Sequence, residues 1–489
     1  MFEFIKNIFN RRQKTMINVD LTEIEQVIQE HLNSQKYREM IDGNKYFAGQ
    51  HDVLKRLRQA IGGAGVLTTI SNLPNNRIVD NQYKKLVKQK VNYILSKSPT
   101  FSAENESEPY EQEIQDIFNK SFLRTLKRVG VDVFNNGIGW MYIYYENNEL
   151  KFKRLNAVEV IPVWADNEHS QLNYAIRIYR TREFVKNAFV EADNVEIYTK
   201  KGIEYYELKT NKLIQKGEAR PYLTVGEQAF NWENIPLIAF RAEELEQPLL
   251  KRVKLLQDTL NELMSDFANN MQEDTRNTIL ILKNYEGEDL GEFRRNLSTY
   301  GAVKVSDDGD LKSLSVEVNA ANYEAIVNLL KKSIIENGAG FDAKSDTLGG
   351  NPNQLNIRSM YSDIDLEAND LENEFQASFE ELMWFVNSHI ANKGVKFTKG
   401  DVDLILNRDI LINESQAITD IKNSIGLLSN ETLVEQHPFV QDATKELERL
   451  KTEQDKQTEQ LYGSNINATG DTSNTQGVVD GNLLANEGN

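Results

Sequence analysis

The sequence predicts an α+β fold in which a β-rich region interrupts a mainly helical chain. Over several long stretches, apolar residues recur at three- and four-residue steps, as on the buried face of a helix. Residues 139–230 instead carry alternating, aromatic-rich runs broken by turn residues, which is typical of antiparallel strands. A short strand-like module, residues 273–319, lies between two long helical stretches.

Composition narrows the class of protein. The chain has 489 residues, enough for about three domains, and its 40% hydrophobic and 27% charged residues are ordinary for a folded soluble protein. A formal net charge of −18 argues against a nucleic-acid binder held by a basic face. The absence of cysteine excludes disulfides and thiolate sites.

No apolar run approaches the ~18 residues that a membrane span needs. The first residues, MFEFIKNIFNRR, place their basic residues after the apolar ones, unlike a signal peptide. Two interpretations stay open for this segment: an amphipathic helix that docks on a neighbour, or a frayed end.

The sequence of the N-terminal region predicts two helices and a turn. Thr22, with Glu25 three residues later, is expected to cap a helix that runs to about Leu32. A second helix is expected from about Ser34 to Phe47. The glycines at 62, 63 and 65 predict a turn, because no Gly-Lys-Ser/Thr follows to make a phosphate loop.

Residues 75–97 are expected to form a helix with one apolar and one basic face. Its apolar positions include Ile78, Tyr83 and Leu86. Its basic residues outnumber Asp80, the one acid, by six to one, a net of +5; they are Arg77, Lys84, Lys85, Lys88, Lys90 and Lys97. This face is either solvated, paired with acids elsewhere in the chain, or paired with another subunit.

A third helix is expected over residues 111–134, followed by the strands. Asn147-Asn148 and Lys201-Gly202 predict hairpin turns. Apolar residues from Leu249 to Phe267 then follow at steps of four and three, which predicts a packed helix or a coiled-coil seam. Residues 279–319 predict short strands around a small helix at 289–298.

The helix at 323–337 is followed by a long glycine-rich loop and a second, longer helix. The loop, residues 338–356, holds four glycines and one proline, so it is either a disordered surface loop or a mobile loop offered to a large partner. Residues 355–392 contain eight acids and one base, Arg358. A strand and further helices follow, with Asn413 and Ser429 as expected N-caps, and residues 463–489 are expected to be disordered.

The sequence shows no catalytic or metal site. The five histidines are scattered, and none stands in an HExxH or HxH setting. The pairs Asp363/Asp365 and Asp401/Asp403 are expected to be structural, because a two-metal nuclease needs carboxylates that converge. We therefore expect no enzyme, no cofactor and no metal.

Two phrases carry a family resemblance: YFAGQHDVL, and NRIVDNQYKKLVKQKVNYILSKSPTF from Asn76 to Phe101. They resemble the N-terminal signature of portal proteins from long-tailed, siphovirus-type bacteriophages, with Ser96 where glycine is frequent. NWENIPLIAFRAEE and GLLSNETLVEQHPFV extend the resemblance over most of the chain.

The resemblance implies a portal fold with named parts. These are a wing of helices and antiparallel strands (1–240), stem helix 1 (243–272), a small αβ clip inserted between the stem helices (273–320), stem helix 2 (321–338), a tunnel loop (339–354), a long wing helix (355–400), a helical crown (401–462) and a disordered tail (463–489).

It also implies sites. The tunnel loop would meet DNA through Phe341, Asp342, Lys344, Asp346, Asn351 and Asn353. The channel-lining stem would present Lys331 and Lys332, each with a salt bridge to a neighbouring subunit as the alternative. The clip would bind the motor and adaptors through Glu288, Asp289, Arg294 and Arg295. Subunits would meet at Arg77, Lys84, Lys85 and Lys88.

The implied function is a ring-shaped homo-oligomer, a dodecamer in virions, that forms the channel for double-stranded DNA at the portal vertex of the capsid. Its implied partners are the terminase large subunit, the major capsid and scaffold proteins and a head-completion adaptor, with assembly in the host cytoplasm and no membrane. Two alternatives stay open: a metal-dependent DNA-processing enzyme of a mobile element, and an acidic scaffold protein without a DNA role.

Overall fold

The computed structural model describes residues 20–61, 66–69, 73–103, 106–185, 187–225, 228–273, 279–283, 310–314, 320–342, 354–408, 414–440 and 443–463. The chain divides into two compact units. The first comprises Met1–Ser345 with Arg358–Ile410, and the second comprises Asp346–Ile357 with Leu411–Asn489. Helices and strands are both abundant, which confirms a mixed helix-and-sheet protein.

The first unit opens with helices α2 (Leu21–Asn33) and α3 (Gln35–Phe47). Asp20, not Thr22, caps α2: its carboxylate accepts a hydrogen bond from the Thr22 backbone nitrogen. Helix α3 begins one residue after the predicted start, and Ser34 caps it by accepting a hydrogen bond from the Tyr37 nitrogen. A short 3₁₀ helix, η1 (Asp52–Lys55), and the strand pair β1 (Gln59–Ile61) and β2 (Leu67–Thr69) come next.

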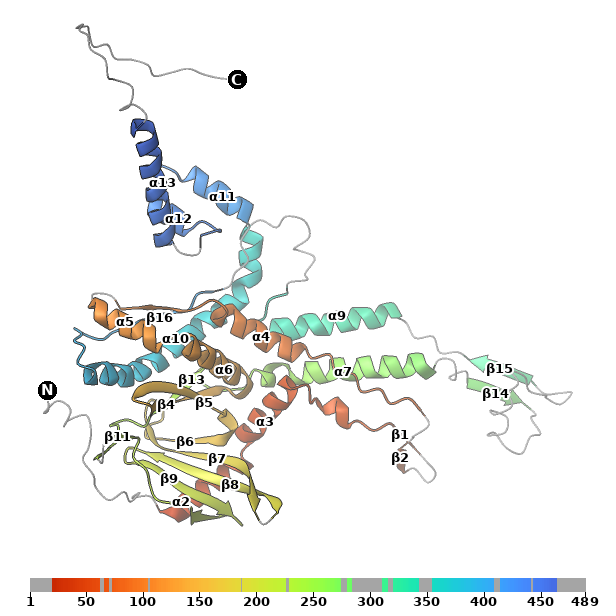
Figure 1. Cartoon of the computed structure of the whole chain (residues 1–489). Helices are drawn as coiled ribbons and strands as arrows, with labels where there is room; N and C mark the ends of the chain where they lie inside the picture. Colours follow the sequence, from red (N-terminus) through yellow and green to blue (C-terminus); the bar gives the residue numbers. More distant parts are fainter. Residues whose placement is uncertain are drawn as a thin grey trace, which may run out of the picture. The chain divides into compact units, whose positions relative to one another are not determined.

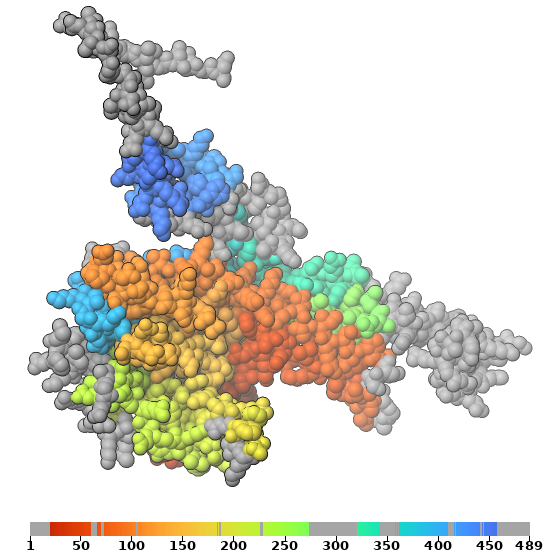
Figure 2. Space-filling model, viewed as in Figure 1, coloured from red at the N-terminus to blue at the C-terminus, as the bar shows by residue number. Residues whose placement is uncertain are grey.

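Three further helices and one short strand precede the β-rich region. They are α4 (Gln82–Leu95), β3 (Thr100–Ser102), α5 (Glu108–Ile117) and α6 (Lys120–Asn136). Helices α5 and α6, in orange, lie on the face of the molecule that Figure 2 shows. Helix α6 ends at Gly137, whose φ of 78° is the left-handed conformation common just past a helix end.

The β-rich region is antiparallel throughout, as predicted. A three-stranded sheet has the order β13-β4-β5, and a five-stranded sheet has the order β10-β9-β8-β7-β6. The strands are β4 (Ile138–Glu146), β5 (Glu149–Leu155), β6 (Val160–Trp164), β7 (Leu172–Val185), β8 (Ala188–Thr199), β9 (Gly202–Lys209), β10 (Lys212–Gln215), the pair β11 (Leu223–Val225) and β12 (Gln228–Phe230), and β13 (Leu237–Arg241). Asn147 and Asn148 both have positive φ at the β4–β5 turn, which confirms that hairpin.

Two apolar clusters hold this region together. Helix α2 covers one face of the five-stranded sheet, where Ile24 and Ile28 pack with Ile176, Val195 and Ile197. A second cluster joins the two sheets, and it contains Trp140, Leu155, Ala175, Tyr198 and Leu237. The two sheets therefore share one core.

Two long helices follow the β-rich region: α7 (Leu250–Glu273) and α9 (Ala320–Asn337). They lie side by side (Figure 1), and the rings of Phe267 and Tyr323 stack at 3.8 Å. Between them in sequence, β14 (Ile279–Lys283) and β15 (Asp310–Leu314) pair antiparallel. The helix predicted at 289–298 lies outside the described residues.

The longest helix is α10 (Gln354–Asn392), and its buried stripe includes Ile364, Leu371, Phe375, Phe379 and Val386. It ends eight residues before the predicted boundary, ahead of Gly394 with φ +83°. The strand β16 (Asp403–Ile405) then pairs with β3. In the second unit, α11 (Glu414–Asn423), α12 (Asn430–Glu435) and α13 (Ala443–Gly463) follow, and Ser429 caps α12 as expected.

Candidate functional site

Helix α7 carries a buried seam of polar side chains, which we call the polar seam. Its members, Gln257, Asn261, Ser265 and Asn269, are spaced four residues apart and are 0–1% exposed. Residues four apart lie above one another on a helix face. Buried amides and hydroxyls need hydrogen-bond partners, because an unpaired polar group costs about 1–3 kcal/mol.

Those partners are supplied by an extended segment, residues 74–81, that runs antiparallel along α7. The backbone nitrogens of Asn76, Ile78 and Asp80 donate to the side chains of Asn269, Ser265 and Asn261 at 2.7, 2.9 and 3.0 Å. Gln257 continues the row by accepting from the Tyr83 nitrogen and donating to the Asp80 carbonyl.

The hydrogen-bonding groups of the extended segment and of α7 are in register because the two elements have similar repeat lengths. Two residues of extended chain rise about 6.6 Å, and four residues of α-helix rise about 6.0 Å. Every second amide of the segment therefore meets every fourth side chain of α7. The sequence prediction of one helix over residues 75–97 is wrong for its first seven residues: α4 begins at Gln82 and is capped by Asn81.

The base of the glycine-rich loop packs closely on α4. A Cβ on Gly338 would stand 2.2 Å from a Leu86 methyl, and one on Gly340 would stand 2.5 Å from the other, so a side chain at either position would force Leu86 to move. Between them, Ala339 holds a left-handed φ of 46°, an uncommon conformation for a residue with a Cβ.

Gln89 and two aromatic rings fix the next residue of the loop, Phe341. The Gln89 side-chain nitrogen donates to the Phe341 carbonyl, and its oxygen accepts from the Phe341 nitrogen at 3.0 Å. The Phe341 ring stacks on Tyr361 of α10 at 4.1 Å, and Tyr361 stacks on Tyr93 of α4 at 5.6 Å. The loop therefore leaves α9 from an anchored start.

Lys90 completes this anchor from the interior. Its ammonium donates to the Ala339 carbonyl at 2.9 Å and pairs with Glu367 of α10, which also pairs with Arg252 of α7. The Lys90 side chain is 2% exposed, and this burial lowers the pKa of its ammonium. The prediction that Lys90 lies on the basic surface of α4 is therefore wrong.

The structure places some of the predicted site residues and does not describe others. Phe341 lies at the buried base of the loop, and Asp342 is half-buried beside it. Lys331 pairs with Asp80 at 2.8 Å, and Lys332 pairs with Glu336 at 3.6 Å, both within the chain. The residues that lie outside the described ranges are Lys344, Asp346, Asn351, Asn353, Glu288, Asp289, Arg294 and Arg295.

The basic residues of the α4 region have different surroundings. Arg77 lies on the extended segment and donates to the Leu54 carbonyl at 3.0 Å. The Lys84 ammonium lies 5.5 Å from the centre of the Phe47 ring, whereas Lys85 and Lys88 are exposed. The two exposed lysines are the stronger candidates for a contact with another subunit.

Sequence reasoning missed the polar seam and the Gln89–Lys90 anchor. A signal for the seam was present, because Gln257, Asn261, Ser265 and Asn269 repeat every four residues beside the apolar stripe. Among the residues that the structure describes, no group of acids and histidines could hold a metal ion, and no helix could cross a membrane.

Comparison with known proteins identifies the family of this chain. The family model described as "Phage portal protein, SPP1 Gp6-like" matches residues 25–460. The chain belongs to this family of phage portal proteins. The portal protein of Bacillus phage SPP1 is 27% identical over 470 residues, which cover 94% of this chain and 91% of that protein. The portal protein of Clostridium phage phiCD119 is 27% identical over 445 residues, with 86% and 93% covered.

One solved structure, titled "Neck of empty GTA particle computed with C6 symmetry", gives a TM-score of 0.42 at 11% identity over 77% of this chain and 94% of that chain. Membership of the portal family shows that the protein is a structural component of the phage virion and not an enzyme, which excludes the metal-dependent enzyme considered above.

Proposed function

We propose that copies of this portal protein form a closed ring, a dodecamer in the virion, through which double-stranded DNA enters and leaves the capsid. One observation carries the proposal: the order of α7, the β14–β15 pair and α9, with α7 and α9 packed side by side through Phe267 and Tyr323. Two joined helices that end in a small inserted module suit a channel wall with a protruding tip.

The parts then take the roles implied by family resemblance. Helices α7 and α9 are the stem, residues 273–320 the clip, residues 339–354 the tunnel loop, residues 401–462 the crown, and the helices and strands of residues 1–240 with α10 the wing. The clip meets the terminase large subunit during packaging and a head-completion adaptor afterwards. The wing and crown meet the major capsid and scaffold proteins at one capsid vertex, with assembly in the host cytoplasm.

The charges of the stem suit a channel in which DNA slides. Each lysine that neutralises a phosphate adds salt-dependent affinity, and a ring multiplies such contacts. Lys331 and Lys332 are both paired with acids of their own chain. A ring of such pairs presents alternating charge with little net attraction, so the duplex is held neither at one register nor by its sequence.

The tunnel loop is proposed to touch DNA beyond its anchored base. Gln89, Lys90 and Tyr361 hold Ala339 and Phe341, so Phe341 serves as the anchor. Lys344, Asp346, Asn351 and Asn353 follow it and would meet the duplex by shape and charge.

A cyclic ring needs two different complementary patches on each subunit. Lys85 and Lys88 on α4 are exposed, and α10 supplies exposed acids such as Asp363 and Asp370. We propose that these surfaces, with Arg77 and Lys84 beside them, pair between neighbours. This pairing suits an acidic protein in which α4 is locally basic.

The first test images the purified protein by negative-stain electron microscopy with a native mass measurement. Rings of about a dozen copies support the proposal, whereas a protein that stays monomeric with and without scaffold protein contradicts it. Replacing residues 342–351 with a Gly/Ser linker should keep the rings and impair DNA packaging. Normal packaging by this variant would remove the loop from the mechanism.

A second test concerns the interface. Reversal of Lys84, Lys85 and Lys88 to glutamate should weaken rings, and more so at low salt. The matched control reverses Lys120, Arg124 and Arg128, three exposed bases on α6. Equal ring yields for the α4 variant and the wild type at low and high salt would show that α4 is not at the interface.

A further inference from the structure

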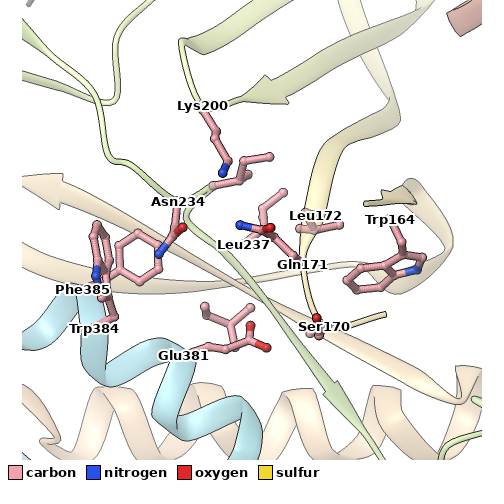
Figure 3. A pocket seen from close by; sticks show the side chains of 13 residues that line it. Trp164, Ser170, Gln171, Leu172, Lys200, Asn234, Leu237, Glu381, Trp384 and Phe385 are labelled. Atoms are coloured by element: carbon pink, nitrogen blue, oxygen red, sulfur yellow. The ribbon is translucent and has the colours of Figure 1, made fainter. Parts of the chain in front are cut away.

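The first unit holds a half-open pocket that the roles above do not use. Its volume is about 430 Å³, and it lies between the two sheets and the C-terminal half of α10. Figure 3 shows Glu381, Trp384 and Phe385 along α10, Lys200 on the β8–β9 turn, and Trp164 on the opposite side. Most of the wall is apolar or aromatic.

Glu381 is the acid of this pocket. It forms no hydrogen bond or ion pair with any residue that the structure describes. It stays open to solvent, yet the surrounding protein disfavours its charge and raises the pKa of the carboxyl to about 7. Two cations face the region, Arg241 of β13, which opposes that rise, and Lys200.

This combination selects a particular kind of ligand. A carboxylate without a partner favours a lysine or arginine side chain, and the half-buried ring of Trp384 favours both a cation and apolar groups. A pocket of this size holds two or three side chains, not a domain. The ligand chemistry is therefore a cationic side chain with apolar neighbours in one short peptide.

The chain carries such a peptide at its start. Residues 1–19 contain Phe2, Phe4, Ile5, Ile8 and Phe9 around four bases and one acid, a net of +3 within a protein of net −18. The bases are Lys6, Arg11, Arg12 and Lys14. Charge and apolar content both complement the pocket.

The described chain begins on the other face of the five-stranded sheet, beside the strand β7 that helps to line the pocket. Asp20 caps α2, and Glu23 in the first turn of α2 interacts with Tyr174 of β7. Tyr174 stands two residues from Leu172, which lines the pocket. The outer strand between this point and the open edge is β6. Nineteen residues can span about 60 Å, which is ample to pass round one strand.

We propose that this pocket is the binding site for the N-terminal segment of its own chain. A base among Lys6, Arg11 and Arg12 pairs with Glu381, and the neighbouring phenylalanines pack on Trp384. Docked in this way, the segment ties α2 and the five-stranded sheet to α10. The proposal does not depend on ring formation.

The first experiment uses all 489 residues of the chain, which contain no cysteine. In the double variant F4C/K200C, mild oxidation should give a disulfide within one chain, seen as a shifted monomer band on a non-reducing gel. The control pair F4C/S121C places the second cysteine at an exposed position on α6. Equal rates for the two pairs, or cross-linking only between chains, would overturn the proposal.

The second experiment measures the recognition chemistry. A synthetic peptide of residues 2–14 should bind a chain that begins at Asp20, followed by tryptophan fluorescence. E381Q should weaken binding about tenfold, because one charge-assisted contact is lost, whereas E380Q on the exposed neighbour should not. Binding to the wild-type pocket should strengthen from pH 6 to pH 8 as Glu381 ionises, and E381Q should remove this dependence. Binding that ignores both Glu381 and pH would contradict the proposed contact.

Discussion

The side-chain oxygen of Asn269 accepts hydrogen bonds from both the backbone and the side-chain nitrogen of Asn76, at 2.7 and 3.0 Å. This contact joins residues 193 positions apart, and it is the outermost of the row that fastens the extended segment to α7. Helix α7 thus holds the chain that leads into α4, and α4 in turn holds the base of the loop after α9.

The centre of the polar seam should be the most sensitive to mutation. Asn261 accepts from the Asp80 nitrogen at 3.0 Å and donates to His51 Nδ1 at 2.8 Å. The substitution N261L leaves both groups buried without partners, and we expect it to lower the free energy of unfolding by about 2–4 kcal/mol. Urea unfolding measures the change. The control E262Q alters an exposed neighbour on α7, and a similar loss there would refute a specific role for the seam.

His51 should make the protein sensitive to acid. Its Nδ1 accepts from Asn261 while its Nε2 hydrogen points to the Tyr46 carbonyl at 3.1 Å, so the ring is neutral. Burial lowers the pKa of His51 below the ordinary 6.5. The unfolded chain then binds more protons below pH 6.5, so stability should be complete above that pH and fall below it.

The measurement is the midpoint of thermal unfolding between pH 5 and pH 8. H51Q should reduce the drop in the unfolding midpoint at acid pH. Part of the drop should remain, because burial also lowers the pKa values of His31 and His389. H437Q, in the second unit, is the control. An unchanged pH profile in H51Q would show that His51 does not carry the effect.

The Gln89 amide should keep the loop base closed. Q89A removes both hydrogen bonds to Phe341. We expect the free energy of local opening at the loop base to fall by about 1–2 kcal/mol. Limited proteolysis should cut after Phe341 or Lys344 several-fold faster, while ring images stay normal. K88A, an exposed change on the same helix, supplies the baseline. Equal cleavage rates in the two variants would argue against the anchor.

The sequence predicted those parts of the fold whose signals are local. The hairpin at Asn147-Asn148 follows from residues that tolerate positive φ, and the Ser429 cap follows from a short-range hydrogen bond. The stripe of α10 follows from apolar spacing alone. Each of these was confirmed because no distant partner was needed to decide it.

The candidate site was less predictable because its geometry is long-range. Ile78 fitted a helical pattern, yet residues 74–81 are extended because α7, some 180 residues later, pairs with their backbone amides. Asp20, and not Thr22, is the N-cap because it lies one residue before the helix, where its side-chain oxygen accepts a hydrogen bond from the Thr22 nitrogen. Polar residues on one helix face cannot reveal whether water or a distant segment satisfies them.

Lys90 and Lys85 form a matched pair for the final prediction. Both are lysines of α4, but Lys90 is buried against Glu367 and the Ala339 carbonyl, whereas Lys85 is exposed. K90M leaves Glu367 with Arg252 as its remaining partner. The free energy of unfolding should therefore fall by about 1–3 kcal/mol, less than for a buried charge that has lost every partner. K85M should change the free energy of unfolding by less than about 0.5 kcal/mol but reduce ring yield if α4 lies at the interface. Denaturant titration and ring counts on the same samples separate the two effects, and a K85M variant as unstable as K90M would show that exposure does not distinguish these lysines.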